Sequence, residues 1–370
     1  MGPRFNSPML LTTLTLENVR RYARYTFHAQ PGINVITGPN GVGKTTLLES
    51  LFILALTKSY KTNKDQHIMK YDAPYFKIYG SFDASSQAHR FDIHVHDKGK
   101  DVRVNQVLYP RLSDYLGRLH VVLFAPEDLD IIKGSPKTRR RFLDLELAQR
   151  DRRYISHLSH YKRLLKERND WLKQGAHHEH KDSVLDVITE QLAHYAQKIM
   201  TVRARFISEL NDLMQAPHRA LAPTDAPVSF TYAPSLPLED PLGAYQKKRV
   251  LDWQFKTTQL GIHRDELQFT TALGPLAEHG SQGQVRTAVL ALKLALSQWF
   301  ERHQQAPPIL LLDDVLSELD QARQKALLKA LHHDAQVFIT ATHLEALALE
   351  DTVLTHHSLH HEDNQRSDQS

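Results

Sequence analysis

The chain has 370 residues, of which 41% are hydrophobic and 24% charged, a balance typical of a globular protein with one large domain or two unequal ones. No apolar run reaches the ~18 residues of a membrane helix, and the absence of cysteine excludes disulfides and thiolate metal sites. The net charge of +4 indicates contact with phosphate only if the basic residues cluster, and otherwise a mildly basic protein without a polyanionic partner.

The N-terminal zone, residues 9–125, alternates strand-like and helix-like stretches. Its first residues lack the apolar core of a secretory signal. We expect a cytoplasmic protein, because the absence of cysteine fits a reducing compartment. Apolar patterning predicts one helix over 45–56. The predicted strands are 10–16, 33–36, 76–82, 91–96 and 119–124.

A glycine-rich loop stands between the second strand and the helix. It reads Gly38-Pro39-Asn40-Gly41-Val42-Gly43-Lys44-Thr45, followed by Thr46. Glycines let backbone N–H groups approach phosphates, and the helix N-terminus favours an anion. We therefore expect a nucleotide here, with Lys44 on the β- and γ-phosphates and the Thr45 hydroxyl on Mg²⁺. A plain glycine-rich turn is the alternative, but the flanking strand and helix favour the nucleotide.

The middle zone, residues 126–241, is predicted to be a helical lobe. It has almost no glycine up to residue 216, and apolar residues recur at helical spacing over 137–173 and 183–214. The resulting hairpin is too short and irregular for a long coiled coil. The proline-rich stretch 217–241 is the predicted return connection.

The C-terminal zone, residues 242–355, resumes α/β character. Apolar runs at 309–312 and 337–339 are typical of parallel strands covered on both faces. The first ends in Asp313 and Asp314, and ligands of α/β sheets bind at the carboxyl ends of strands. We expect Asp313 to support Mg²⁺, directly or through water, and Asp314 to orient or deprotonate the attacking water.

The phosphate loop and the acidic strand are separated by more than half of the chain. Such a separation implies that a large insertion, the helical lobe, interrupts one nucleotide-binding core. Residues 356–370 are predicted to be a polar tail. The spacing of His356, His357, His360 and His361 is compatible with a metal site, but a polar tail accounts for these residues as well.

Three further motifs resemble those of the ABC family of ATPases. Ser281-Gln282-Gly283-Gln284 is similar to the signature, which in that family binds the γ-phosphate of ATP held by the other protomer. Leu316-Ser317-Glu318-Leu319-Asp320 resembles the loop at the dimer seam, and Thr340-Ala341-Thr342-His343 resembles the switch whose histidine senses the γ-phosphate. The resemblance implies an α/β fold: an ABC-type ATPase head with mixed sheets around a phosphate loop, plus an inserted α-helical lobe.

A finer resemblance is to the RecF family of bacterial recombination and repair proteins. It covers about residues 10 to 350 and is carried by the signature together with segments 16–22, 59–62, 126–129, 134–144 and 261–266. It implies an ATPase of recombinational repair that helps to load recombinase at single-strand gaps and supports replication and the SOS response. The implied partners are DNA, double-stranded or gapped and in some cases single-stranded, and the RecR and RecO proteins.

The sequence departs from these patterns at a few positions. RecF proteins commonly have Pro in place of Ile262 and Asp in place of Glu266. Most ABC enzymes have Glu in place of Asp314, and the shorter side chain is expected to slow hydrolysis. No clear glutamine loop is present, and the segment Pro126–Asp128 is a candidate for its place.

One phosphate loop and one signature per chain imply that two copies share each ATP. The γ-phosphate would make charge-assisted contacts to both protomers, so ATP would hold a homodimer together until hydrolysis. We expect a slow, DNA-stimulated ATP hydrolase that uses Mg²⁺, in which Lys44, Asp314 and His343 serve catalysis and Asp320 contacts the nucleotide.

Basic residues are densest at Arg139-Arg140-Arg141 and Lys247-Lys248-Arg249, with Lys61 near the first helix. Such groups can neutralise DNA phosphates and give salt-dependent, sequence-independent binding. The first cluster is equally consistent with ion pairs that fix the helical lobe. The DNA prediction therefore rests mainly on the family resemblance.

Three other functions are compatible with a phosphate loop. A DNA-tethering protein of the SMC and Rad50 class would need a longer coiled coil, and a transporter ATPase would need a glutamine loop. A nucleotide switch with negligible turnover stays open because of Asp314.

Overall fold

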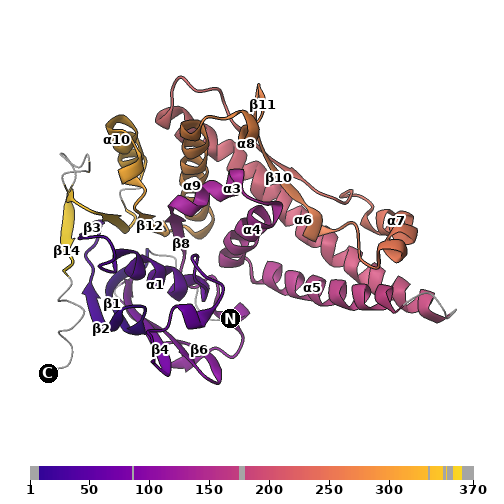
Figure 1. Ribbon diagram of the computed structural model, residues 1–370, viewed down its shortest axis with the longest axis horizontal. Helices are drawn as coiled ribbons and strands as arrows, with labels where there is room; N and C mark the ends of the chain where they lie inside the picture. Colours follow the sequence, from indigo (N-terminus) through magenta and orange to yellow (C-terminus); the bar gives the residue numbers. More distant parts are fainter. Residues whose placement is uncertain are drawn as a thin grey trace. The chain divides into compact units, whose positions relative to one another are not determined.

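The computed structural model describes residues 8–85, 87–174, 180–331, 334–344, 347 and 353–360 (Figure 1). The chain forms two compact units. The first comprises Met1–Asp128, Ala216–Asp225 and Thr287–Ser370, and the second comprises Leu129–Gln215 and Ala226–Arg286. The helical lobe is therefore grouped with residues 226–286, which extend beyond the predicted boundary at 241.

A six-stranded antiparallel sheet forms one layer of the first unit. Its strand order is β2-β1-β4-β5-β6-β7. Side chains alternate between a buried and a more exposed face, the pattern of a sheet with one face on the core. The strands are β1 (Leu10–Val19), β2 (Tyr22–His28), β4 (Tyr75–Ala84), β5 (Gln87–His96), β6 (Gly99–Val104) and β7 (Val107–Leu108).

A five-stranded parallel sheet forms the second layer, in the order β14-β3-β13-β12-β8. The residues of β8, β12 and β13 are buried throughout, as expected for parallel strands covered on both faces. The strands are β3 (Ile33–Thr37), β8 (Val121–Phe124), β12 (Ile309–Asp313), β13 (Val337–Ala341) and β14 (Leu354–Ser358).

Helix α1 (Lys44–Leu56) contacts strands of both sheets, β1, β4 and β5 on one side and β8, β12 and β13 on the other. Every residue of the helix except Thr45 is buried, so it is the centre of the core rather than an amphipathic surface helix. This position places the start of the helix at the carboxyl ends of β3 and β12. Within the same unit lie α2 (Leu112–Tyr115), α10 (Gln321–Ala330) and the one-turn segments η1 (Asp65–His67), η2 (Pro126–Leu129) and η4 (Leu316–Glu318).

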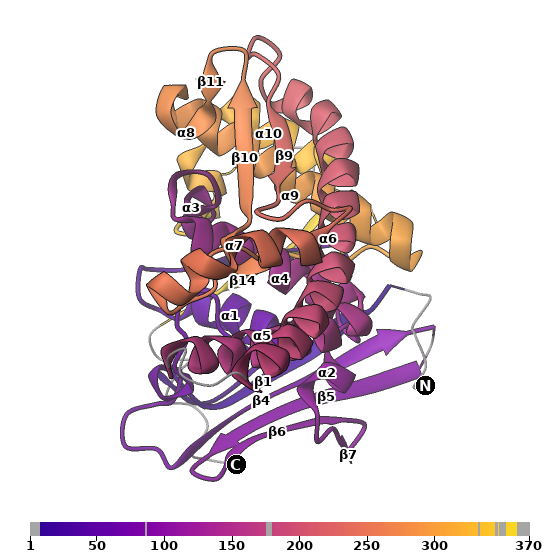
Figure 2. The ribbon, with the colours of Figure 1, turned by 90° about the vertical axis from the view of Figure 1, so that its right-hand side faces the viewer.

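The second unit combines helices with a three-stranded sheet of order β11-β10-β9 (Figure 2). Helices α5 and α6 are joined by buried contacts, such as Arg168 Nε to Thr189 Oγ1 at 3.0 Å. The helices are α3 (Asp130–Lys133), α4 (Pro136–Arg150), α5 (Arg152–Lys173), α6 (His180–Leu221), α7 (Pro241–Phe255), α8 (Leu276–His279) and α9 (Gln282–Gln304). The remaining elements are β9 (Ser229–Ala233), η3 (Ile262–Arg264), β10 (Glu266–Thr271) and β11 (Gly274–Pro275). Helix α6 continues into residues of the first unit, whereas only residues 282–286 of α9 belong to the second unit and the rest of that helix belongs to the first.

Two expectations about irregular segments differ from the structure. The stretch 217–241 is not only a connection, because α6 continues to Leu221 and β9 pairs with β10. The polar tail does not begin at His356, because Leu354–Ser358 forms β14 beside β3. Its histidines gave no strand signal because the pairing depends on a partner some 320 residues away.

Across the described ranges, no helix has both the length and the apolar content that crossing a membrane requires.

Candidate nucleotide site

The glycine-rich loop joins β3 to α1 with a backbone that only glycine adopts without strain. Gly38, Gly41 and Gly43 have φ angles of +148°, +78° and +112°. At Gly43 a Cβ would lie 2.3 Å from the hydroxyl of Tyr22, and at Gly38 it would lie 2.5 Å from the carbonyl oxygen of Leu359. The glycines therefore fit both the loop conformation and the close packing of β2 and the chain after β14.

Lys44 is the first residue of α1 and its side chain turns back over the loop. Its Nζ donates to the carbonyl oxygens of Gly38 at 2.6 Å and Pro39 at 3.1 Å. Burial lowers the pKa of Lys44, while the nearby carboxylates Asp314 and Asp313 oppose that shift. A buried cation at the mouth of an anion-binding loop is well suited to phosphate, which would restore the stabilisation that water gives elsewhere.

Thr45 and Asp313 come together from positions far apart in the sequence. The Thr45 hydroxyl donates to Asp313 Oδ1 at 2.7 Å, and the Thr340 hydroxyl donates to the same oxygen at 3.0 Å. Asp313 is only 2% exposed, which is tolerable for a carboxylate because several donors surround it. A hydroxyl and a carboxylate placed next to a phosphate loop are the oxygen ligands that Mg²⁺ prefers, so these residues fit that ion.

Tyr60 and Lys61 cover the other oxygen of Asp313, which the sequence did not reveal. The Tyr60 hydroxyl donates to Asp313 Oδ2 at 2.7 Å, and Lys61 Nζ lies 3.5 Å from the same atom. Burial and the charge of Asp313 raise the pKa of Tyr60, so its hydroxyl remains a donor. The sequence indicated the segment 59–62 as a family motif and Lys61 as a DNA contact; in the structure Lys61 faces Asp313, and this pairing depends on tertiary folding.

An ion pair between a buried carboxylate and a partly exposed arginine fixes this covering segment. Glu49 of α1 accepts from Arg20 Nη2 at 2.8 Å and Nε at 3.2 Å, and from the Ser59 hydroxyl at 2.5 Å. The Ser59 hydroxyl also accepts the N–H of Lys61 at 2.9 Å. Because Glu49 is 2% exposed, the two-bond contact with Arg20 is needed to hold its charge.

Asp314 follows Asp313 in a left-handed conformation with φ +54°. Its N–H donates to Thr340 Oγ1 at 2.9 Å, and the Ser317 hydroxyl donates to Asp314 Oδ1 at 2.9 Å. The side chain of Asp314 is exposed, whereas that of Asp313 is buried. An exposed carboxylate beside a phosphate loop can orient or accept a proton from water.

Three other predicted residues lie on segments that follow these strands. His343 is exposed just after β13, the strand between β3 and β12. Asp320 caps α10, where its carboxylate accepts the N–H of Arg323 at 2.9 Å. In the Pro126–Asp128 segment, which directly follows β8, Glu127 Oε1 lies 4.0 Å from Lys61 Nζ.

The signature segment lies in the second unit, where Ser281 is the residue before α9. Gln284 N–H donates to Ser281 Oγ at 3.2 Å, and Ser281 N–H donates to Gln284 Oε1 at 3.0 Å. This reciprocal pair is a capping box that starts the 23-residue helix. Ser281 and Gln282 are exposed and Gly283 is half-buried, so this helix N-terminus is open to an external anion.

The arginine cluster on α4 is largely engaged within the second unit. Arg139 binds Glu266 through Nε at 2.5 Å and Nη2 at 2.9 Å, and Arg140 Nη1 donates to the carbonyl of Asp265 at 2.8 Å. Arg141 is exposed. The alternative, that these side chains fix the helical lobe, thus has direct contacts in its favour, while the DNA role stays a prediction.

The histidines whose spacing is compatible with a metal site lie along β14 and just beyond it. His356 Nε2 is 2.7 Å from the Thr37 hydroxyl, and His357 Nε2 is 3.1 Å from Asn34 Oδ1. Successive side chains of a strand point to opposite faces, so these two rings do not share a ligand position. His361 lies outside the described residues.

Comparison with known proteins agrees with a nucleotide-binding site of this kind. The profile described as RecF/RecN/SMC N terminal domain matches residues 10–364. The protein "DNA replication and repair protein RecF" of Staphylococcus aureus (strain JH9) is 39% identical over 350 residues, or 92% of this chain and 95% of the relative. The protein of the same name from strain Newman gives the same figures.

Solved structures agree. The recombination mediator protein RecF-ATPrS in the RecFOR pathway superposes with a TM-score of 0.85 at 29% identity, covering 93% of this chain and 95% of that one. The corresponding RecF-ATP structure gives 0.84 at 30% identity, covering 93% and 94%. An Smc head domain from Pyrococcus furiosus, at 0.52 and 16% identity over 92% of each chain, shares the fold alone. The predicted fold class is confirmed.

Proposed function

Because this chain belongs to the RecF/RecN/SMC N-terminal domain family, we propose that it is a DNA repair and replication protein that binds and hydrolyses ATP. The observation that carries the proposal is the 2.7 Å contact between Thr45 Oγ1 and Asp313 Oδ1. It joins the phosphate loop to the acidic strand across 268 residues of sequence, beside a buried lysine. Two similarities support the same activity. The relatives are named as RecF DNA replication and repair proteins, and a similar solved structure is a RecF-ATP complex.

In the proposed site, Lys44 and the loop N–H groups bind the β- and γ-phosphates. Thr45 and Asp313 would hold Mg²⁺, which supplies charge neutralisation on the phosphates when bound. Asp314 orients the attacking water and accepts its proton, and His343 contacts the γ-phosphate. Glu127 occupies the place of the missing glutamine loop, next to Lys61.

We further propose that ATP is shared by two copies of the chain. One copy supplies Lys44, and its partner supplies the N-terminus of α9 with Ser281, Gln282, Gly283 and Gln284, while Asp320 lies at the seam. The exposed capping box supports this arrangement, because its backbone N–H groups and helix dipole favour a phosphate. DNA, RecR and RecO are the proposed partners, and DNA is expected to increase a slow turnover.

The test measures ATP turnover and sedimentation together, with and without double-stranded DNA. Wild type should be a monomer or weak dimer without nucleotide, and a dimer with ATP. Lys44→Met should abolish ATP binding or hydrolysis, and Ser281→Arg should bind ATP but stay monomeric. An ATP-dependent dimer that persists in Ser281→Arg contradicts the shared site.

A low-turnover nucleotide switch is the second candidate. The Ser317 hydroxyl donates to Oδ1 of Asp314, so one of the two oxygens of this short side chain is already engaged. The two functions differ in single-turnover experiments. The switch predicts ATP-dependent dimers whose lifetime is unaffected by Asp314→Asn, whereas the ATPase predicts that this variant traps the dimer.

A further inference from the structure

Two histidines and an aspartate form a cluster on the more exposed face of the six-stranded sheet, apart from the residues of the nucleotide site. His94-Val95-His96 ends β5, and the period of two along a strand puts both imidazoles on one face while Val95 is buried on the other. Asp101 of β6 is the direct cross-strand partner of His94. The arrangement therefore follows from sequence and register together.

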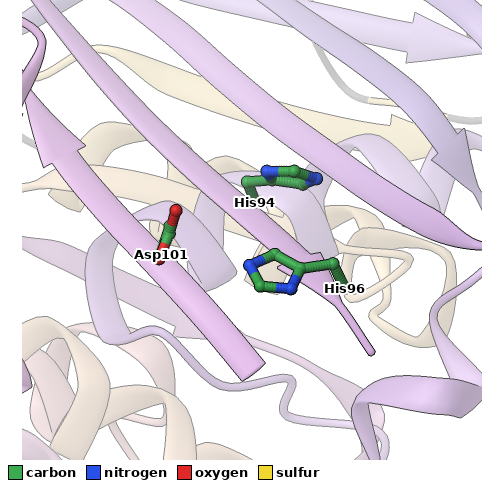
Figure 3. A group of neighbouring side chains, drawn as sticks. All are labelled: His94, His96 and Asp101. Atoms are coloured by element: carbon green, nitrogen blue, oxygen red, sulfur yellow. The ribbon is translucent and has the colours of Figure 1, made fainter. Parts of the chain in front are cut away.

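The three side chains converge on one another (Figure 3). One ligand atom from each of His94, His96 and Asp101 lies within 4.8 Å of the others. Ligands about 2.1 Å from one zinc ion lie about 3.4 Å apart in a tetrahedral site. Binding of one ion therefore requires side-chain rotations that bring the three ligand atoms closer together.

One buried nitrogen of the cluster lacks a hydrogen-bond partner within the described ranges. Nε2 of His94 is buried and has no hydrogen-bond partner among the described residues. A buried polar atom without a partner is unfavourable, and coordination to a cation would satisfy it. The Tyr75 ring packs edge-on against His94 at 5.4 Å between centroids and restricts the imidazole.

Arg103 and the backbone of Lys98 orient the other two ligands, Asp101 and His96. Arg103 Nη2 donates to Asp101 Oδ2 at 2.8 Å, which fixes the carboxylate and leaves its second oxygen for a metal. His96 Nδ1 accepts the N–H of Lys98 at 3.1 Å, while its other ring nitrogen is turned toward Asp101 (Figure 3). The nearby Lys77 ammonium lies over the Tyr75 ring at 4.8 Å.

We propose that His94, His96 and Asp101 bind a divalent transition-metal ion of the zinc class, with water completing the coordination. Two imidazoles and one carboxylate suit Zn²⁺, whereas Mg²⁺ requires oxygen ligands, so this site and the nucleotide site select different ions. The ion clamps β5 to β6 across the two-residue turn Asp97-Lys98. Its effect is to stabilise the outer part of the sheet.

The test titrates Zn²⁺ into the full chain, stripped with a chelator and held in excess Mg²⁺, by isothermal titration calorimetry. Wild type should bind one zinc ion, and its midpoint of thermal unfolding should rise with zinc concentration. His94→Ala and His96→Ala should each weaken binding at least about tenfold, and Asp101→Asn should weaken it too. His28→Ala, which removes an exposed histidine at the end of β2, is the matched control and should bind as wild type.

Retained ATP binding shows that each variant is folded. A further readout is the visible absorption of Co²⁺, which is intense in a four-coordinate site and should vanish in His94→Gln. No saturable zinc binding by the wild type would overturn the proposal. So would zinc binding that survives His94→Ala and His96→Ala but is lost in His360→Ala, because the ion would then belong to the C-terminal histidines.

Discussion

At the scale of residues, Asp313 shows how a buried charge depends on its donors. Thr45, Thr340 and Tyr60 each donate a hydroxyl to it, and Lys61 adds a positive charge. The first contact could be anticipated, because a phosphate-loop threonine and an acidic strand end are expected at one site. Tyr60 could not, because nothing in a basic segment after the first helix specifies that it folds back onto a strand 253 residues away.

His263 is a partly buried histidine whose neutral form fits its surroundings. The Tyr161 hydroxyl is 2.8 Å from Nδ1, and Nε2 is 3.2 Å from the carbonyl of Thr258, so one nitrogen accepts and the other donates. Burial lowers the pKa of His263 to about 4. Protonation would add an unsolvated charge and remove the acceptor.

The pH dependence of stability follows from that shift. The unfolded histidine titrates near pH 6.5, so the contribution of His263 is complete above that pH and declines as the pH falls toward about 4. The loss should be about 2–3 kcal/mol of unfolding free energy. Urea unfolding should show that the unfolding free energy declines between pH 7 and pH 4 in both proteins. The decline should be smaller by that amount in His263→Gln than in wild type. An equal decline in both proteins would contradict the assignment.

The arginines of α4 offer a matched pair. Arg139→Gln breaks the two-bond contact and leaves the Glu266 carboxylate half-buried without it, so the unfolding free energy should fall by about 2 kcal/mol. Arg141→Gln changes an exposed side chain, whose surface interactions are worth less than about 1 kcal/mol, and should therefore cost less than Arg139→Gln.

DNA affinity separates the two roles. Measured by fluorescence anisotropy over a salt series, Arg141→Gln should weaken binding and reduce the salt dependence if the cluster contacts phosphate. Unchanged affinity at every salt concentration would restrict the cluster to its structural contacts.

At the scale of elements, the predicted strands and helices with strong apolar patterns were confirmed. Continuous apolar runs predicted β12 and β13, and helical periodicity predicted the long helices of the lobe, although α4 and α5 are interrupted at Asp151. Short strands such as β9 and β14 were missed, because polar sequences pair only when a neighbouring strand is present. The boundaries of α6 also extend beyond a proline that suggested a connection.

The capping box of α9 couples stability to the proposed dimer. Ser281→Ala removes the acceptor for the N–H of Gln284 and should lower the unfolding free energy by about 1 kcal/mol. Ser281→Asp keeps an equally good cap, so its stability should match wild type. The added negative charge would repel the γ-phosphate, so Ser281→Asp should remain monomeric in ATP by analytical ultracentrifugation. If this variant dimerises at the ATP concentrations that suffice for wild type, Ser281 caps the helix but does not contact the γ-phosphate.

At the scale of the whole molecule, the two halves of the proposed site belong to different compact units. Lys44 lies in the first and Ser281 in the second. In a two-fold dimer with shared sites, Lys44 of each copy faces Ser281 of the other copy. Mixtures of inactive variants can test whether that pairing occurs between chains.

Lys44→Met and Ser281→Arg should be inactive separately but partly active when mixed. A heterodimer combines both substitutions in one site and leaves the other site intact, so random pairing restores up to about a quarter of wild-type turnover. A phosphate-release assay on equal mixtures measures this. No recovery in the mixture, with both proteins folded and heterodimers detected, would place both residues in one chain's site.

Strand β14 ties the chain after residue 353 to the root of the phosphate loop. Leu359 N–H donates to the carbonyl of Thr37 at 2.8 Å, one residue before Gly38. A truncation before Leu354 would therefore leave the edge of β3 open to pairing with other molecules and would remove the neighbour against which Gly38 packs. An affinity tag or fluorescent protein fused directly after this strand would therefore perturb the phosphate loop. The nucleotide affinity measured with such a fusion would differ from that of the untagged chain.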